Sequence, residues 1–125
     1  MSNLKSEKSN NIRFRAYDFS LVVIELVKDF PQTKMYMIFM DQLLRSATSI
    51  GANVFEAKSS SSKRDFIRFY EIALKSANET KYWLGLLRDA LNVNGDDTRL
   101  LLQETEEISR MIAASLLTLK NKNKL

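Results

Sequence analysis

Apolar and polar positions alternate with the period of an α-helix along most of the chain. The pattern is clearest over residues 62–91, where apolar or small side chains recur at unbroken steps of four and three. This spacing is typical of the buried seam of a helical bundle. We therefore predict one long helix here that buries this seam. Its residues are Phe66, Tyr70, Ala73, Ala77, Thr80, Leu84, Leu87 and Leu91.

Breaks in the periodicity divide the chain into four predicted helices. Pro31 ends the first, because proline cannot donate a backbone hydrogen bond, and four consecutive serines at 59–62 end the second. Ser62 and Asp65 have the spacing of a capping box at the start of the third helix, and Asp96 is the predicted N-cap of the fourth, since aspartate often caps helices. The predicted helices cover 12–29, 34–57, 62–91 and 96–120, with a disordered tail over 1–11 and a frayed tail over 121–125.

Two of these helices carry apolar stripes, and the sequence does not show directly which surface covers each stripe. In the first helix, Phe14, Tyr17, Leu21 and Ile24 recur at steps of three and four, so we expect them to face the core. In the third helix, a second stripe lies roughly 100° from the seam. A neighbouring subunit or a wide core face would cover it equally well. Its residues are Phe69, Ile72, Trp83, Leu86 and Ala90.

Composition fits one soluble all-α domain with little catalytic chemistry. The chain has 125 residues, of which 45% are hydrophobic and 27% charged, with no cysteine and no histidine. Disulfides, thiolate catalysis, His-dependent triads and the usual zinc or di-iron ligand sets are thereby excluded. No apolar run approaches the roughly 18–20 residues of a membrane span. We expect a cytoplasmic protein with no metal, no cofactor and no membrane partner.

A net charge of +4 directs attention to basic residues on the third helix. Arg64, Arg68 and Lys75 fall within roughly 40° of one another, opposite the seam, and Lys58 and Lys63 flank the serine turn. Such a row suits binding to a phosphate backbone. Asp65 and Glu71 interrupt it, and a solvated face of mixed charge is the alternative. The candidate nucleic-acid-binding residues are Arg64, Arg68, Lys75, Lys58 and Lys63.

Polar residues of the second helix form another candidate cluster. Asp41, Arg45, Asn53 and Glu56 lie at near-helical spacings, so they could bind an anion or a partner. We favour an ion-pair network within and between subunits that fixes helix register. Gly51 is costly inside a helix, and we interpret it as a point of close helix packing.

The fourth helix is acidic. Glu104 and Glu107 are predicted to share an exposed face with Gln103 and Arg110. Paired carboxylates can hold Mg²⁺ for phosphoryl chemistry, but a carboxylate-dependent nuclease is the least favoured reading.

The second and third helices together resemble a known bacterial family. The residues that carry the resemblance are Gln42–Asn53 (QLLRSATSIGAN), Glu56-Ala57, Asp65-Phe66-Ile67, Ile72–Lys75, Glu79-Thr80 and Tyr82-Trp83-Leu84. They are similar to the four-helix-bundle family named after open reading frames in 23S rRNA intervening sequences, over about Phe14 to Lys120. One departure is Ser76, where this branch often has a carboxylate.

The resemblance implies an antiparallel up-down four-helix bundle that assembles into a ring, typically a homopentamer. Related bundles are basic accessory proteins of diversity-generating reverse transcriptases and are thought to contact nucleic acid. No catalytic residues are established for the family. The leading hypothesis is thus a non-enzymatic oligomeric protein that binds RNA or DNA, with Phe69, Ile72, Trp83 and Leu86 at the subunit interface. The alternative is a protein-interaction scaffold with no nucleic-acid role.

Overall fold

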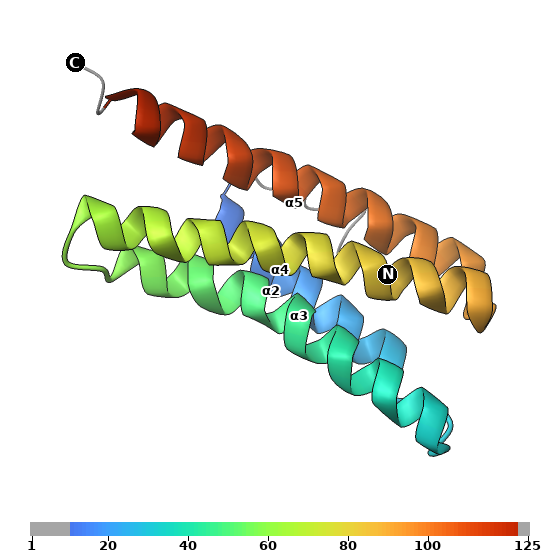
Figure 1. The fold of residues 1–125 in the computed structure, drawn as a ribbon. Coiled ribbons are helices and arrows are strands. Elements are labelled where there is room, and N and C mark those ends of the chain that lie inside the picture. The colour runs from blue at the N-terminus through green and yellow to red at the C-terminus, as the bar shows by residue number, and fades with distance from the viewer. Residues whose placement is uncertain (1–10, 123–125) are drawn as a thin grey trace.

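The structure, a computed structural model, describes residues 11–122, and these form four α-helices packed as a bundle (Figure 1). Short turns join consecutive helices, so each helix runs antiparallel to the one before it (Figure 1). α3 packs along α4, α5 returns beside α4, and α2 lies against both α3 and α5. The helices are α2 (Ile12–Val27), α3 (Lys34–Lys58), α4 (Lys63–Ala90) and α5 (Gly95–Lys122).

The helix bounds lie within two residues of the expected ranges. The predicted disordered tail lies outside the described residues except for Asn11, whose side-chain oxygen accepts a hydrogen bond from the Arg13 backbone N–H at 3.0 Å and caps α2. Of the tail predicted to fray, Asn121 and Lys122 belong to α5, and residues 123–125 lie outside the described part.

The turns follow from local capping chemistry. Ser62 caps α4 as predicted, since its hydroxyl accepts a hydrogen bond from the Asp65 backbone N–H at 3.1 Å. After α4, Asn92 takes the left-handed conformation (φ 53°), which asparagine tolerates better than most residues. Asp96 as the N-cap of α5 is wrong. The helix begins one residue earlier, and the Asn94 side chain accepts the Asp97 N–H at 3.4 Å.

The predicted seam of α4 is confirmed at the centre of the core. Its six central members are buried, and the terminal Phe66 and Leu91 are partly buried. The one polar residue of the seam is satisfied: the Thr80 hydroxyl is 3.0 Å from the Ser46 hydroxyl and 2.8 Å from the Ser76 carbonyl oxygen. A buried hydroxyl with partners costs little, so this threonine fits among apolar neighbours.

α2 has apolar side chains on two opposite faces, and the predicted core stripe is the wrong one. Phe14, Tyr17, Leu21 and Ile24 are 41–61% exposed; we call them the outer stripe. The opposite face packs on α3, where Ala16 lies beside Gly51 and a Cβ built on this glycine would be 3.5 Å from the Ala16 carbonyl oxygen. The buried residues of α2 are Arg15, Ala16, Phe19, Val22, Val23 and Val27.

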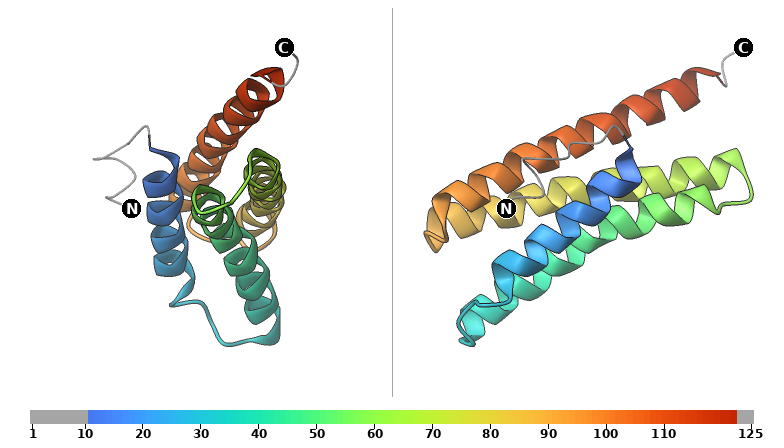
Figure 2. Two further views of the ribbon diagram at one scale, coloured as in Figure 1. Left: turned by 90° about the vertical axis from the view of Figure 1, so that its left-hand side faces the viewer. Right: turned by 180° about the vertical axis from the view of Figure 1, so that it is seen from behind.

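The four helices are unequal in length, and the bundle is incomplete at one end. α2 has 16 residues, whereas the other three have 25 to 28. At 1.5 Å per residue, α5 is roughly 18 Å longer than α2. Its C-terminal part diverges from α4 beyond the start of α2 (Figure 2). α3, α4 and α5 therefore continue past α2 without a fourth helix.

Candidate nucleic-acid interface

The outward face of α4 carries the predicted basic row. Arg64, Arg68 and Lys75 are all exposed, and they share one side of the helix, opposite the buried seam. The guanidinium of Arg68 lies over the Phe69 ring, 4.6 Å from its centroid, which orients the group. These three cations form a row on an outward helix face.

The two carboxylates that interrupt the row both have cationic partners. Glu71 accepts a hydrogen bond from Lys120 of α5 at 2.9 Å, and Asp65 lies 4.0 Å from the Nε of Arg68. Exposed pairs of this kind contribute little to stability, but they offset the negative charge locally. Near the start of α4, cations therefore outnumber carboxylates.

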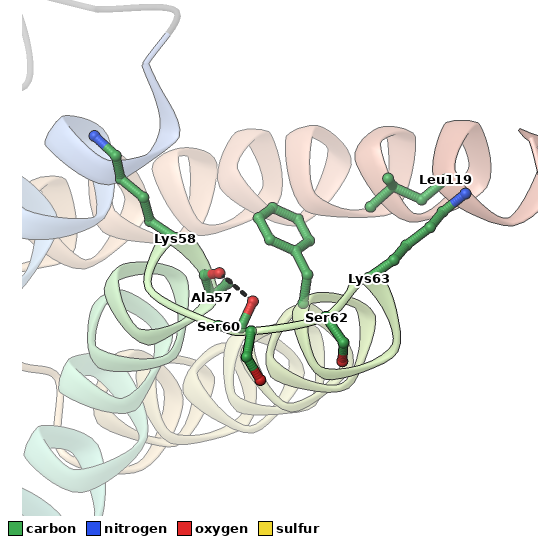
Figure 3. Close-up of a pocket in the computed structure, with 8 residues that line it drawn as sticks. Ala57, Lys58, Ser60, Ser62, Lys63 and Leu119 are labelled. Atoms are coloured by element: carbon green, nitrogen blue, oxygen red, sulfur yellow. Dashed lines mark hydrogen bonds between the residues drawn. The ribbon is translucent and has the colours of Figure 1, made fainter.

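The serine turn between α3 and α4 extends this basic region around a hollow (Figure 3). The hollow has a volume of about 390 Å³, and Leu119 of α5 is among the residues that line it. In Figure 3, the Ser60 hydroxyl bonds the Ala57 carbonyl oxygen (2.6 Å), which ends α3. Lys58 and Lys63 stand at either side of this turn and line the hollow. Four of the five predicted binding residues thus lie on α4, and Lys58 is the last residue of α3, across the serine turn.

A second hollow of about 370 Å³ adjoins the first and lies between α4 and α5. Phe66 and Leu119 line both hollows. We call the two together the end slot, because they occupy the part of the bundle that α2 does not reach. The other residues of the second hollow are Ala114, Ser115 and Thr118.

The polar residues predicted on α3 are not brought together within one chain. Asp41, Arg45 and Glu56 are exposed, and no ion pair joins them in residues 11–122. Asn53 instead donates to the Ser49 carbonyl oxygen at 2.8 Å and lies 3.0 Å from its hydroxyl. The Ser49 hydroxyl also contacts Ser76 of α4 at 2.8 Å. The asparagine therefore belongs to the contact between α3 and α4, and a network between subunits stays a prediction.

The predicted interface residues of α4 fall into two groups. Phe69 and Trp83 are partly buried and pack against the core of their own chain. The indole of Trp83 meets Phe39 of α3 edge-on, with ring centroids 5.6 Å apart. Ile72 is 36% exposed and Leu86 is half-buried. A wide core face accounts for the two aromatic residues, and only the aliphatic pair faces outward.

A buried ion cluster between α2 and α5 escaped prediction. Arg15 donates to both carboxylate oxygens of Glu104, from Nη2 at 2.6 Å and from Nε at 3.0 Å, and to Glu107 at 2.9 Å. Arg15 is 8% exposed and Glu104 is 3% exposed. The bond to Glu104 is the main cause that raises the pKa of Arg15. The predicted exposed face is therefore wrong for Glu104, because this carboxylate is the partner of a buried arginine.

Neither a metal site nor a membrane-spanning helix is found in the part of the chain that the structure describes. Within residues 11–122, no cluster of three or more acidic, histidine or cysteine side chains could hold a metal ion. None of the described helices has the length and apolar character needed to cross a membrane.

Comparison with known proteins decides the family. The family profile described as 23S rRNA-intervening sequence protein matches residues 8–114, which include α2, α3, α4 and most of α5. The chain belongs to this family. A solved structure is also similar to the 23S rRNA-intervening sequence chain described here: a protein of unknown function from the S23 ribosomal protein family of Bacteroides thetaiotaomicron VPI-5482. The two sequences are 32% identical, with a TM-score of 0.79, over 85% of this chain and 98% of that chain.

The family match confirms the resemblance seen in the second and third helices. No protein in the comparison with curated sequences is similar to the chain. The solved relative is described as having unknown function, so membership of the 23S rRNA-intervening sequence family establishes the fold and leaves the activity to be inferred.

Proposed function

We propose that the chain is a non-enzymatic, homo-oligomeric protein that binds RNA or DNA phosphates through the outward face of α4. The observation that carries the proposal is the charge of this face. Arg64, Arg68 and Lys75 are exposed in one row, and the carboxylates within the row are paired with cations. Binding through phosphates gains free energy from counterion release and needs no base-specific groups.

Self-association is the second part of the proposal. A ring of identical subunits, five by family resemblance, would repeat the α4 face around its rim. Repeated weak sites on one assembly bind a polyanion much more tightly than a single site. The family name, which refers to 23S rRNA, supports RNA as the first ligand to test, and we propose a cytoplasmic location in keeping with such a ligand.

The non-enzymatic part rests on the surroundings of the acidic residues. Glu104 and Glu107 are the paired carboxylates considered for Mg²⁺, but Arg15 donates hydrogen bonds to both oxygens of Glu104. The full sequence also has no histidine or cysteine for general acid–base or nucleophilic chemistry.

A protein-interaction scaffold with no nucleic-acid role is the second candidate. The outer stripe of α2 favours it, because four large apolar side chains stand 41–61% exposed on one helix face. Exposed apolar surface of this extent marks a protein contact more often than a solvated face.

Fluorescence anisotropy separates the two candidates. A labelled structured RNA and a DNA duplex are titrated with protein at about 50 and 200 mM salt, where phosphate binding should weaken steeply. Arg68→Glu should weaken binding about tenfold, equivalent to about 1.4 kcal/mol. Arg99→Glu, which makes the same charge change on an exposed residue at the far end of the bundle, is the matched control. No binding at the lower salt, or equal loss in both variants, would contradict the role of α4.

A further inference from the structure

Two surfaces in the described part of this chain are not covered by another of its helices, and they are of complementary kinds. Within residues 11–122, no helix packs over the outer stripe of α2, and the end slot consists of two adjoining open hollows at the end of the bundle that α2 does not reach. We propose that the outer stripe of one copy docks into the end slot of a second copy. This inference rests on the self-association in the proposed function and names the surfaces that would make it.

The outer stripe has the geometry of a buried helix face. Phe14, Tyr17, Leu21 and Ile24 span one side of α2, directly opposite its core face. Phe55 of α3 extends the stripe: it is 46% exposed, and its ring meets that of Tyr17 with centroids 6.5 Å apart. A helix that is apolar on both sides is typically buried on both sides.

The area of the outer stripe suits an interface between chains. At about half exposure, each of Phe14, Tyr17 and Phe55 offers roughly 100 Å². With the two aliphatic residues the stripe approaches about 400 Å², near half of the roughly 800 Å² that each partner gives to a standard interface. Because each copy carries both surfaces, each would form two such contacts, one through α2 and one through the slot.

The end slot begins where α2 stops. The Arg15 side chain reaches Met111, with Nη1 3.5 Å from the sulfur, and one turn further along α5 the slot opens at Ala114 and Ser115. Small side chains on this wall leave room for large ones, and Phe66 and Leu119 supply an apolar floor. The slot can therefore accept the aromatic and aliphatic side chains of a helix.

Charge and composition favour a second copy as the occupant. Lys58 and Lys63 line the mouth of the slot, and Asp18 borders the outer stripe on one edge of α2, next to Glu25, which is paired with Lys28 at 2.9 Å. Residues 1–10 of the same chain carry only two apolar side chains, Met1 and Leu4, and so offer little apolar surface to Phe66 and Leu119 of the slot. A contact between two different surfaces of identical chains is heterologous, and repeated contacts of this kind close into a ring or continue as a filament.

Cysteine cross-linking tests the docking directly, because the natural sequence has no cysteine. Tyr17→Cys on the outer stripe and Thr118→Cys in the slot are purified separately, refolded together and oxidised. A disulfide requires Cα atoms within about 7 Å. We expect up to about half of the chains to run as linked dimers, since random mixing places a Thr118→Cys slot beside half of the Tyr17→Cys stripes, and neither variant alone to do so. Ala113→Cys replaces Thr118→Cys as a control, since it is exposed about 140° around α5 from the slot.

Every other outcome contradicts a specific part of the proposal, provided that the mass of the protein without cross-links is measured in parallel. Linked dimers of Tyr17→Cys alone would mean that two outer stripes face each other, and the slot would be excluded. An oligomer without cross-links in any mixture would place the interface elsewhere, with Ile72 and Leu86 the next candidates. A monomeric wild type would remove the self-association itself, and the proposed function would fail in that part.

Discussion

The outward faces of α2 and α4 differ in kind, although both helices bury their opposite faces in the same core. The outward face of α4 carries Arg64, Arg68 and Lys75, whereas that of α2 carries Phe14, Tyr17, Leu21 and Ile24. Water solvates the first well and the second poorly. Covering half-exposed apolar side chains contributes roughly 1 kcal/mol for each one, so α2 gains from a partner chain in a way that α4 does not.

The core faces of the same two helices differ in whether they contain a charged side chain. The core seam of α4 has one polar residue, Thr80, whose hydroxyl is hydrogen-bonded. The core face of α2 instead holds an arginine, and Glu104 of α5 supplies both oxygens to it. α2 therefore combines an ion pair inside with apolar residues outside, the reverse of the usual surface helix. The ion pair fixes α2 to α5, and this leaves the outer stripe in a defined position.

Arg15→Ala tests the interior half of this comparison and should have the largest effect. The substitution leaves Glu104 buried without its partner, and breaking a buried ion pair typically costs about 3 to 5 kcal/mol in free energy of unfolding. Urea denaturation followed by circular dichroism measures the loss. The double variant Arg15→Met/Glu104→Leu should recover most of it, since an apolar pair of similar size replaces the charges. A double variant no more stable than Arg15→Ala would contradict this account of the cluster.

Paired substitutions on α2 compare its two faces. Phe19 is fully buried. Phe19→Ala should lower the free energy of unfolding by about 3 to 4 kcal/mol, because apolar burial is lost and a cavity is left behind. Phe14→Ala removes the same side chain from a position that is 61% exposed and should cost less than about 0.5 kcal/mol in the monomer. Both are measured in protein diluted until light scattering shows a single chain. Equal losses would mean that the outer stripe belongs to the fold of the single chain.

Glycine substitutions in two helix interiors give the smallest expected effect. A Cβ on Gly85 of α4 would meet nothing within 4 Å, so Gly85→Ala should raise the free energy of unfolding by about 1 kcal/mol. Gly51→Ala places its methyl group 3.5 Å from the Ala16 carbonyl oxygen, an ordinary contact distance, and should gain no more than that. Thermal melts of both variants check the order. A large loss in Gly51→Ala would show that α2 cannot move away from α3.

The fold was predictable because long helices have strong periodic signals. In α4 the steps of four and three between Tyr70 and Leu87 locate the buried face, since the side opposite is largely polar or charged. In α2, apolar residues on both faces recur with the spacing of a helix. The apolar pattern alone therefore predicted the face of Tyr17 as the core face, whereas the face of Phe19 is the buried one. The length mismatch between α2 and α5 was visible in the predicted ranges, but the slot that it creates depends on how the helices cross.

The charged contacts were the least predictable part of the site. Arg15 and Glu104 are 89 residues apart in the chain, and Lys120 and Glu71 are 49 apart, so no local pattern links them. The one available signal was Arg15 itself, since a single arginine on an otherwise apolar helix face needs a buried partner. The basic row on α4 could be predicted from the sequence, because Arg64, Arg68 and Lys75 share one face of one helix.

The central claim is that the outward face of α2 is an interface with another copy, and light scattering on a sizing column tests it most directly. Wild type should show a mass that is a multiple of the 14.4 kDa chain. Leu21→Glu puts a charge into the outer stripe and should shift the protein to a single chain with unchanged helicity, whereas Ile72→Glu on α4 should leave the assembly intact. A wild type of 14.4 kDa, or a Leu21→Glu variant of undiminished mass, would contradict the account.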